Sequence, residues 1–402
     1  MAISEKQMKI LAFSYTTKYQ SLICDGAVRS GKTSIMTIAF IDWAMREFNN
    51  TNFAICGKTV GSAIKNIIVP YMSTAYSRKY NVNFTRSDNK MTVQYGSRIN
   101  TFYIYGGKDE SSYMLIQGIT LGGVLLDEVA LMTRSFVEQA LARCSINKSR
   151  FWFNCNPENP EHWFREEWIL KVEQKKALHL HFAMTDNPSL SQEILERYEN
   201  MYSGVFYERY VKGCWVVAEG LIYPDYKDAI VPTVDRKYTE YQISIDYGIQ
   251  NPFAMGLYGL CGGVWYKVKE YHHSGRETHK QKTDGEYYED LEKFAGDLPI
   301  RRIIIDPSAS SFITLIRRKN VYVAVEAKNA VLDGIRNTAS AMKQGKLKIN
   351  DCCIESIKEA DVYAWDEKAT EDTPIKESDH HCDEMRYFVQ TNKLVMPILK
   401  LF

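Results

Sequence analysis

SLICDGAVRSGKTSIMTIAFIDWAM, at residues 21–45, is the stretch that decides the fold of the first half of the chain. An apolar run, Leu22-Ile23-Cys24, leads into a loop with two glycines, and residues 34–45 then follow a helical pattern of apolar positions. The loop, GAVRSGKT, fits the pattern GxxxxGK followed by Ser or Thr, which cradles phosphates when a strand precedes it and a helix follows. This context predicts a nucleotide-binding α/β unit.

Each defined position of that pattern has a distinct expected task in holding Mg-ATP. Gly26, Ser30 and Gly31 allow backbone N–H groups to turn towards phosphate oxygens, and the start of the helix adds partial positive charge. Lys32 is expected to reach the terminal phosphates, and Thr33 to ligate Mg²⁺. The loop therefore predicts ATP and Mg²⁺ as cofactors.

A second motif, GGVLLDE at residues 122–128, has the form of a short apolar strand that ends in two acids. Asp127 is expected to hold Mg²⁺ through water beside the loop, and Glu128 to orient and deprotonate the attacking water. Strands often end in solvated acids, but the two motifs in this order favour a site that hydrolyses ATP.

Three further residues are candidates for work at the same site. Asn154, at the end of the next apolar run, is a candidate sensor that couples the γ-phosphate to moving parts, although a plain Asn-Pro turn explains the pattern about as well. Arg29 and Arg143 are candidates for the positive charge that stabilises phosphoryl transfer. The sequence leaves the choice open, because such an arginine can also come from a neighbouring subunit.

An aspartate closes each of two apolar runs in the second half, Asp246 after ISI and Asp306 after III. The segment DHHCDEMRY begins a predicted helix at residues 378–392, in which the i to i+3 spacing puts His380 and Asp383 on one face. Three clustered carboxylates repel one another unless they share cations. The three aspartates therefore predict a site for two Mg²⁺ or Mn²⁺ ions that hydrolyses phosphodiesters.

Zinc is an alternative for the run His380-His381-Cys382. No matching pair of Cys or His lies at finger spacing, and His272-His273 is expected in a loop. We therefore expect no structural zinc site here. His380 stays a candidate ligand or proton carrier beside Asp383.

The order and spacing of strand-like and helix-like segments differ between the two halves of the chain. Apolar runs separated by helix-compatible stretches predict a mostly parallel α/β sheet in the first half. Closely spaced strand patterns predict an antiparallel meander, and then a mixed α/β order, in the second. The predicted strands are residues 21–25, 53–56, 99–105, 124–127, 151–155, 242–247, 254–260, 264–270, 301–306 and 321–325.

Glycines and a proline interrupt the periodicity between residues 213 and 224. We therefore expect an ATPase domain at residues 1–210, a linker at 211–225 and a second α/β domain at 226–402. A chain of 402 residues with 45% hydrophobic residues is long enough for two cores.

Composition narrows the function classes further. The net charge of +1 gives no sign of a polyanionic partner, so any contact with nucleic acid must come from local patches or from bound metal. Nine cysteines without a CxxC pair fit a reducing compartment. With no apolar run near the ~20 residues of a membrane span and no signal-like start, we expect a soluble cytoplasmic protein without membrane contact.

In these motifs and in their order, the chain resembles the large terminase subunits of tailed phages and prophages. Almost the whole chain takes part. The resemblance implies a P-loop NTPase motor of the ASCE type, followed by an RNase H-like nuclease. The similar stretches are GAVRSGKT, GGVLLDE, FWFNCNPENPEHWF, FAMTDNPSLS, the connector at residues 213–224, SIDYG, IIIDPS and DHHCDEMRY.

By this resemblance, the P-loop, acidic-strand and nuclease positions of the family fall on the residues singled out above, and His380 falls where related members carry a histidine. Two positions depart from the pattern. Ala27 stands where many members have a second glycine, and Asn154-Cys155-Asn156 stands where a short Ser/Thr-Ala-Thr-like coupling run is common. The first departure leaves the loop geometry intact, and the second leaves the coupling role of Asn154 open.

The resemblance also implies partners and a setting. It implies that the substrate is double-stranded DNA, that a small terminase subunit is a partner, and that several subunits form a ring on the capsid portal. It also implies that the protein acts in the host bacterial cytoplasm, is transiently at the portal vertex of the procapsid, and is not part of the mature virion. Two alternatives stay open on the sequence. One is a helicase or repair-type ATPase whose second half only binds nucleic acid, and the other is a degenerate prophage remnant that serves as an assembly scaffold.

Overall fold

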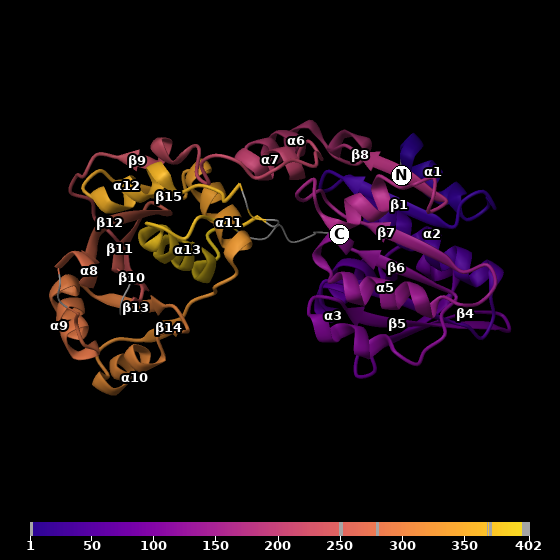
Figure 1. Ribbon diagram of the computed structural model, residues 1–402, viewed down its shortest axis with the longest axis horizontal. Helices are drawn as coiled ribbons and strands as arrows, with labels where there is room; N and C mark the ends of the chain where they lie inside the picture. The colour runs from indigo at the N-terminus through magenta and orange to yellow at the C-terminus, as the bar shows by residue number, and fades with distance from the viewer. Residues whose placement is uncertain (1–2, 249–251, 279–280, 368, 370–371, 396–402) are drawn as a thin grey trace. The chain divides into compact units, whose positions relative to one another are not determined.

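The chain folds into two compact units (Figure 1). The first unit contains the chain up to Glu196 together with Tyr207–Val217. The second contains Arg197–Phe206 and the described part of the chain from Ala218 to Val395. The computed structural model describes residues 3–248, 252–278, 281–367, 369 and 372–395.

An eight-stranded sheet forms the centre of the first unit. Its strands are β1 (Ser21–Gly26), β2 (Asn52–Gly57), β3 (Asn81–Thr85), β4 (Lys90–Tyr95), β5 (Arg98–Gly106), β6 (Gly123–Asp127), β7 (Arg150–Asn154) and β8 (Ala177–Phe182). Their order is β3-β4-β5-β2-β6-β7-β1-β8. The strands from β5 to β8 along this order are all parallel, and β3 and β4 add an antiparallel edge. The predicted mostly parallel sheet is confirmed.

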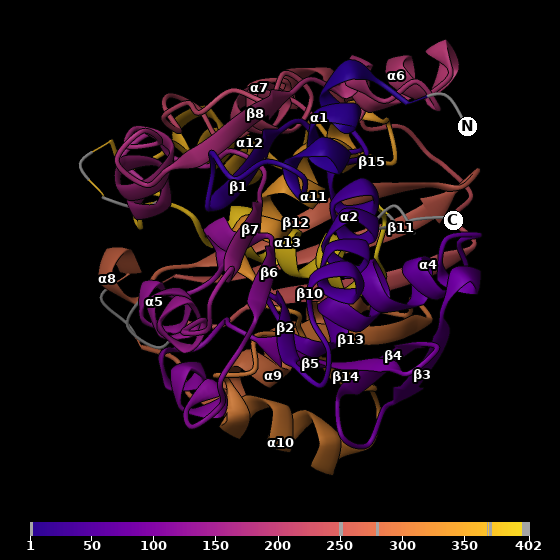
Figure 2. The ribbon, with the colours of Figure 1, turned by 90° about the vertical axis from the view of Figure 1, so that its right-hand side faces the viewer.

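Helices cover both faces of this sheet. Leu22 and Cys24 of β1 belong to the core under α2, whereas Ile23 belongs to the core under α5, because successive side chains of a strand point to opposite faces. Figure 2 shows α2 and α5 on opposite sides of the strands. The helices are α1 (Glu5–Phe13), α2 (Lys32–Glu47), α3 (Val60–Ala63), α4 (Val69–Met72) and α5 (Arg134–Arg143). Two further helices, α6 (Gln192–Glu199) and α7 (Gly204–Tyr210), each contain residues of both units.

A seven-stranded mixed sheet forms the centre of the second unit. Its strands are β9 (Ile230–Val231), β10 (Glu240–Asp246), β11 (Phe253–Cys261), β12 (Val264–His273), β13 (Ile300–Ile305), β14 (Ala324–Glu326) and β15 (Leu347–Asn350). Strands β10, β11 and β12 form the predicted antiparallel meander, and β13 and β14 run parallel to β10 on its other side. Strands β15 and β9 extend the sheet beyond β12. This order agrees with the predicted RNase H-like fold.

The second sheet also packs helices on both faces. Ile243 and Ile245 of β10 share a core with α9 and α10, whereas Ser244 between them donates a 2.7 Å hydrogen bond to the Glu384 carbonyl of α13. Helix α13 therefore covers the other face, beside α11 (Figure 1). The helices are α8 (Gly275–Thr278), α9 (Asp284–Ala295), α10 (Ser310–Lys319), α11 (Val331–Lys343), α12 (Ile354–Val362) and α13 (His380–Asn392).

Short 3-10 or π-helical turns complete both units, at Ile64–Ile68, Ser77–Lys79, Glu110–Ile116, Val129–Leu131, Arg165–Ile169, Met184–Asp186 and Tyr226–Ala229. A search of the described residues finds no helix with the length and apolar character needed to cross a bilayer.

One expectation about the second unit is wrong. His272 and His273 do not lie in a loop, because β12 continues to His273 and pairs both residues with β11, opposite Ala254 and Phe253. The polar run after the meander looked like a turn in the sequence, but the backbone pairing with β11 continues through it.

Candidate functional site

The loop between β1 and α2 closes around the ammonium group of Lys32. The Lys32 Nζ donates hydrogen bonds to the carbonyl oxygens of Gly26 at 3.0 Å and Ala27 at 2.7 Å, and to the Ser30 hydroxyl at 3.2 Å. Gly26 has a φ of 120°, and a Cβ on it would lie 2.0 Å from the Phe182 carbonyl oxygen. Only glycine fits there, so the loop geometry explains the first glycine of the motif.

Lys32 is almost completely buried, and its surroundings change its acidity. Burial lowers the pKa of its ammonium group to about 8, against the opposing effect of nearby acidic groups. The side-chain oxygen of Asn156 lies 3.4 Å from the same nitrogen. The site therefore holds a buried cation whose partners are neutral oxygens, and phosphate oxygens would be stronger partners.

Three polar side chains meet beside the loop. The Thr33 hydroxyl donates a 3.0 Å hydrogen bond to the Asp127 carboxylate, and the Asn154 amide donates to the Thr33 hydroxyl at 2.8 Å and to the same carboxylate. Asp127 ends β6 and Asn154 ends the parallel neighbour β7, in direct register. The structure thus brings these three predicted site residues together at the carboxyl edge of the sheet, where α/β folds bind ligands.

Glu128 and Arg29 both have left-handed backbone conformations. Glu128 follows β6 with a φ of 61°, and Arg29 lies in the loop with a φ of 59°. Residues other than glycine adopt this region at a cost, and such positions concentrate at functional sites. The Asn187 side chain holds the Arg29 carbonyl through a 2.6 Å hydrogen bond. Arg143 ends α5, and its buried Nε has no hydrogen-bond partner among the described residues.

A buried carboxylate that the sequence motifs did not predict lies directly before the loop. Asp25 accepts hydrogen bonds from the Trp215 indole at 2.6 Å, from His179 at 2.8 Å and from His181 at 3.1 Å. Burial opposes ionisation, but the two histidines outweigh it and hold the pKa of Asp25 below its usual range. One signal was present in the sequence, because His179 and His181 alternate along β8 and so share a face.

The acids predicted for the second unit converge. Asp246 ends β10, Asp306 directly follows the parallel neighbour β13, and Asp383 lies in the first turn of α13. Burial raises the pKa of Asp246, and repulsion from Asp383 and Asp306 raises it further. The His380 Nδ1 lies 2.8 Å from an Asp246 oxygen. The three carboxylates are therefore within electrostatic range of one another, with His380 beside them.

Asp306 is held by donors that the sequence analysis did not find. One oxygen accepts a 2.7 Å hydrogen bond from the Ser308 N–H, and the other accepts from Asn329 at 2.8 Å and from the Tyr387 hydroxyl at 2.6 Å. Burial alone would raise the pKa of Asp306, but the bonds from Ser308 and Tyr387 bring it below the usual range. The carboxylate is fixed in place and kept ionised.

Asp383 lies between two cations. One oxygen accepts a 3.0 Å hydrogen bond from the Arg386 Nε and forms an ion pair with its Nη2 at 3.0 Å, and the other oxygen lies 3.5 Å from the Lys376 ammonium. The pKa of His380 is raised, because Asp246 and other nearby carboxylates outweigh the opposing effect of burial. Carboxylates and one imidazole are suitable ligands for Mg²⁺ or Mn²⁺. A two-metal site holds its ions about 3.5–4 Å apart, so its carboxylates spread more widely than the ligands of one ion.

These observations define a P-loop nucleotide-binding unit joined to an RNase H-like unit with an acidic centre. Residues 23–227 match the sequence model of the terminase large subunit, T4likevirus-type, N-terminal, over just over half of the chain. The chain belongs to the terminase large subunit family. The predicted class, a large terminase with an ATPase unit followed by a nuclease unit, is thereby confirmed.

Similar proteins cover different parts of the chain. The large terminase of a thermophilic bacteriophage has 51% identity and a TM-score of 0.93, over 97% of this chain and 99% of that one. A structure of that protein in complex with ADP has 50% identity and a TM-score of 0.90, with the same coverage. The terminase large subunit of Escherichia phage T5 is 23% identical over 245 residues, 56% of this chain and 54% of that protein. The chain thus matches about half the length of the T5 relative.

Proposed function

We propose that the first unit hydrolyses ATP to drive double-stranded DNA into a procapsid, and that the second unit cuts concatemeric DNA with divalent metal ions. The observation that supports this most directly is the presence of two separate clusters, one built around Lys32 and one around Asp246, in different units. The family, and the complexes of the thermophilic phage terminase with ADP and ATP-γ-S, support nucleotide binding.

In the ATP site, each predicted residue has a place in the proposed chemistry. ATP supplies the phosphoryl group, and Mg²⁺ offsets its charge. Lys32 would exchange its carbonyl partners for phosphate oxygens, Thr33 would ligate the metal, and Asp127 would hold it through water. Glu128, one residue beyond Asp127, orients the attacking water and accepts its proton. Asn154 touches both metal-binding side chains and so stays the candidate that reports the nucleotide state.

In the nuclease site, Asp246, Asp306 and Asp383 would hold two Mg²⁺ or Mn²⁺ ions. Such ions activate water and stabilise the leaving oxygen of a phosphodiester. His380 contacts Asp246 directly and is placed to serve as a ligand or to hold a proton. The bonds from Tyr387 and Asn329 fix Asp306 before any metal arrives.

The assembly and the setting belong to the same proposal. We propose domains at residues 1–210 and 226–402 with a linker at 211–225. We also propose that several subunits form a ring at the portal and that a small terminase subunit is a partner. The cation that stabilises the transition state of ATP hydrolysis would be Arg29 or an arginine of a neighbouring subunit. The protein would act in the host cytoplasm. Because the net charge is only +1, DNA contact depends on local cationic patches and on metal at the acidic centre.

Two substitutions test the proposal in the full chain. Glu128→Gln should bind nucleotide but lose ATP turnover by about 10²-fold or more, the scale of a lost general base. Asp246→Asn should lose cleavage of supercoiled plasmid with Mg²⁺ or Mn²⁺ and keep its ATPase activity. Each variant is the folding control for the other. Surviving turnover in Glu128→Gln contradicts the assignment of Glu128, and a wild type without cleavage favours the helicase-type alternative.

A further inference from the structure

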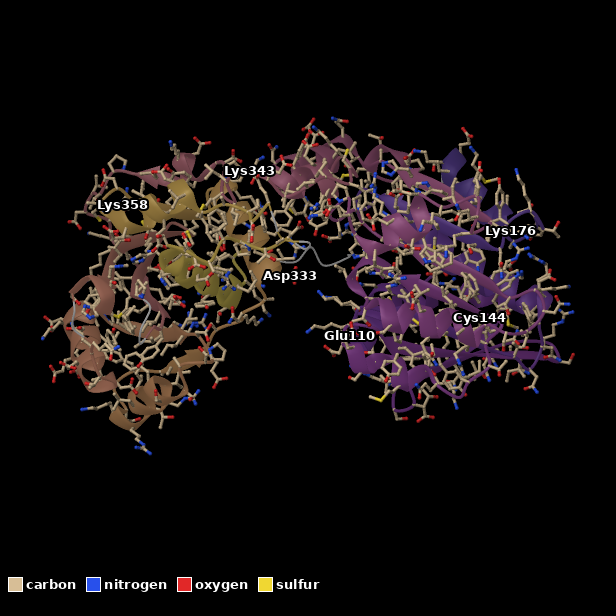
Figure 3. All side chains as sticks on the ribbon, viewed as in Figure 1. Glu110, Cys144, Lys176, Asp333, Lys343 and Lys358 are labelled. Atoms are coloured by element: carbon tan, nitrogen blue, oxygen red, sulfur yellow. The ribbon has the colours of Figure 1, made fainter. Side chains whose placement is uncertain are left out.

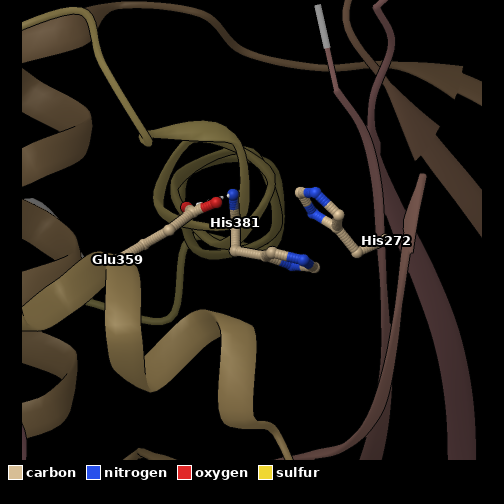
Figure 4. Close-up of side chains that lie close together, drawn as sticks. All are labelled: His272, Glu359 and His381. Carbon is tan, nitrogen blue, oxygen red and sulfur yellow. Dashed lines mark hydrogen bonds between the residues drawn. The ribbon is translucent and has the colours of Figure 1, made fainter. Parts of the chain in front are cut away.

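A separate group of potential metal ligands lies in the second unit, outside the three aspartates. His272 comes from β12, Glu359 from α12 and His381 from α13 (Figure 4). One candidate ligand atom from each lies within 4.8 Å of the other two, and no other such trio of His, Cys, Asp or Glu occurs among the described residues. Three separate elements thus bring two imidazoles and a carboxylate together.

His381 gives this group its strongest feature. The side chain is fully buried, and its Nε2 has no hydrogen-bond partner within the described parts of the chain. Its ring lies against the ring of His272, with centroids 5.5 Å apart and planes at 29° (Figure 4). A buried polar atom without a partner is destabilising. A metal ion at this nitrogen would remove that destabilisation.

Glu359 is buried and already orients one of its neighbours. One of its oxygens accepts hydrogen bonds from the backbone N–H groups of His381 at 2.6 Å and Cys382 at 3.1 Å. It therefore caps the start of α13 from another helix, and its second oxygen is left for a ligand. The preceding residue, Lys358, is exposed on α12, so the helix turns Glu359 inward (Figure 3).

The charges around His381 favour a cation. Lys267 is fully buried and forms an ion pair with Glu384, and Glu270 lies 3.8 Å from the same ammonium. With Glu359, three carboxyl side chains and one ammonium group lie near His381, so acidic groups outnumber the buried cation. A divalent ion would add positive charge beside these acidic groups.

The other nitrogen of His381 is also suitably placed. Nδ1 lies 3.8 Å from a Glu270 oxygen and 3.9 Å from a Glu384 oxygen. When Nε2 binds a metal, Nδ1 carries the proton, and a carboxylate beside it is the usual second contact of a metal-bound histidine. In the structure, Lys267 donates a 3.3 Å hydrogen bond to Nδ1; with a proton on Nδ1 it would release that bond and keep Glu384 and Ser356 as its acceptors.

We propose that His272, Glu359 and His381 bind one borderline divalent transition metal ion of the Zn²⁺ class, which ties β12, α12 and the start of α13 together. Two imidazole nitrogens and one carboxylate oxygen match this class, whereas Mg²⁺ and Ca²⁺ prefer oxygen alone. Ligands of a tetrahedral ion lie about 3.4 Å apart, so the side chains need to close by roughly an ångström. The ion would fix the helical turn that carries His380 and Asp383.

Cobalt(II) absorption tests this assignment in the full chain. Four-coordinate Co²⁺ with nitrogen and oxygen ligands absorbs visible light far more strongly than hydrated Co²⁺. The titration uses Asp246→Asn as background, which weakens the nuclease centre, and compares added His272→Ala with added His273→Ala. The background and the His273 variant should each bind one Co²⁺ with this spectrum, and the His272 variant should lose it.

His273 is the matched control, because it is the adjacent histidine of the same strand. An unchanged spectrum in the His272 variant, or no strong band in the background protein, overturns the proposal. Thermal unfolding gives a second measurement: Zn²⁺ should raise the melting temperature of the background and of the His273 variant, but not of the His272 variant. Neither measurement uses cleavage, so a failure of the proposed nuclease function would leave this test intact.

Discussion

Asp25 shows how much of the ATP site depends on a single side chain next to the motif. Its carboxylate joins the base of the phosphate loop to the edge strand β8 and to Trp215 in the segment that follows α7. The loop is also held by the Val28 N–H, which donates to the Tyr210 carbonyl at 2.9 Å. The segment 207–217 therefore supports the loop through two independent contacts, and Asp25 makes one of them.

This contact predicts a pH dependence of the first unit. The pKa of His181 is raised, chiefly by its hydrogen bond to Asp25. A raised pKa in the folded state means that the stabilisation is complete below the unfolded value of about 6.5 and is lost as the pH rises through the folded value. The free energy of unfolding of the first unit should fall over that range by less than about 1 kcal/mol, because His181 is half-exposed, and the urea midpoint should fall with it.

Tryptophan fluorescence during urea unfolding measures this effect, since five of the seven tryptophans, Trp43, Trp152 and Trp215 among them, belong to the first unit. His181→Gln and Asp25→Asn should each remove that part of the pH dependence. The pKa of Asp25 itself is lowered, so the stability that its ionisation contributes is lost only in strong acid. That loss does not overlap with the pH range in which His181 titrates. A wild-type midpoint that rises from neutral to alkaline pH relative to His181→Gln would contradict the assignment.

At the scale of elements, the sequence predicts those parts whose own residues carry a strong pattern. The apolar runs of β1, β6, β10 and β13 are buried on both faces and were expected within a residue or two. The missed strands are short or lie towards an edge, where pairing with a neighbour, rather than local pattern, makes them strands. They are β3, β4, β8, β9 and β15.

In helix α13, the local sequence pattern predicts the helix itself, whereas contacts with distant residues determine how it is capped. Its apolar pattern predicted the helix at residues 378–392, and the structure begins it at His380. Its N-terminal cap could not be predicted, because Asp379 makes no side-chain capping bond and Glu359, from the separate helix α12, does so instead. Long-range contacts of this kind also place Tyr387 and Asn329 on Asp306.

Packing of α13 on the sheet gives a prediction at this scale. Gly256 of β11 leaves room for the buried Glu384 carboxylate, and a Cβ there would lie 2.4 Å from it. Gly256→Ala should displace α13, lower the stability of the second unit by about 1–3 kcal/mol and reduce cleavage while ATPase activity is kept. Gly285→Ala is the control, since its Cβ meets only the Thr283 hydroxyl at 3.8 Å. Equal effects of the two substitutions would contradict this role of Gly256.

At the scale of the whole molecule, two chemistries occupy two units, each built around a sheet. The convergence of Asp246 and Asp306 followed from the sequence, because the carboxyl ends of neighbouring parallel strands meet at one edge. The convergence of His272 with His381 did not, because it depends on β12 extending to His273. The sequence thus predicts sites that lie at strand ends, but not sites that arise where separate elements pack.

We propose that the three aspartates of the second unit hold metal ions apart from the phosphate loop. Anomalous diffraction from crystals soaked in Mn²⁺ locates such ions. We expect anomalous peaks between Asp246, Asp306 and Asp383, with His380 in contact, in wild-type protein, and the loss of these peaks in Asp246→Asn. Peaks confined to the phosphate loop or to the His272 cluster, with the three aspartates unliganded, would contradict it.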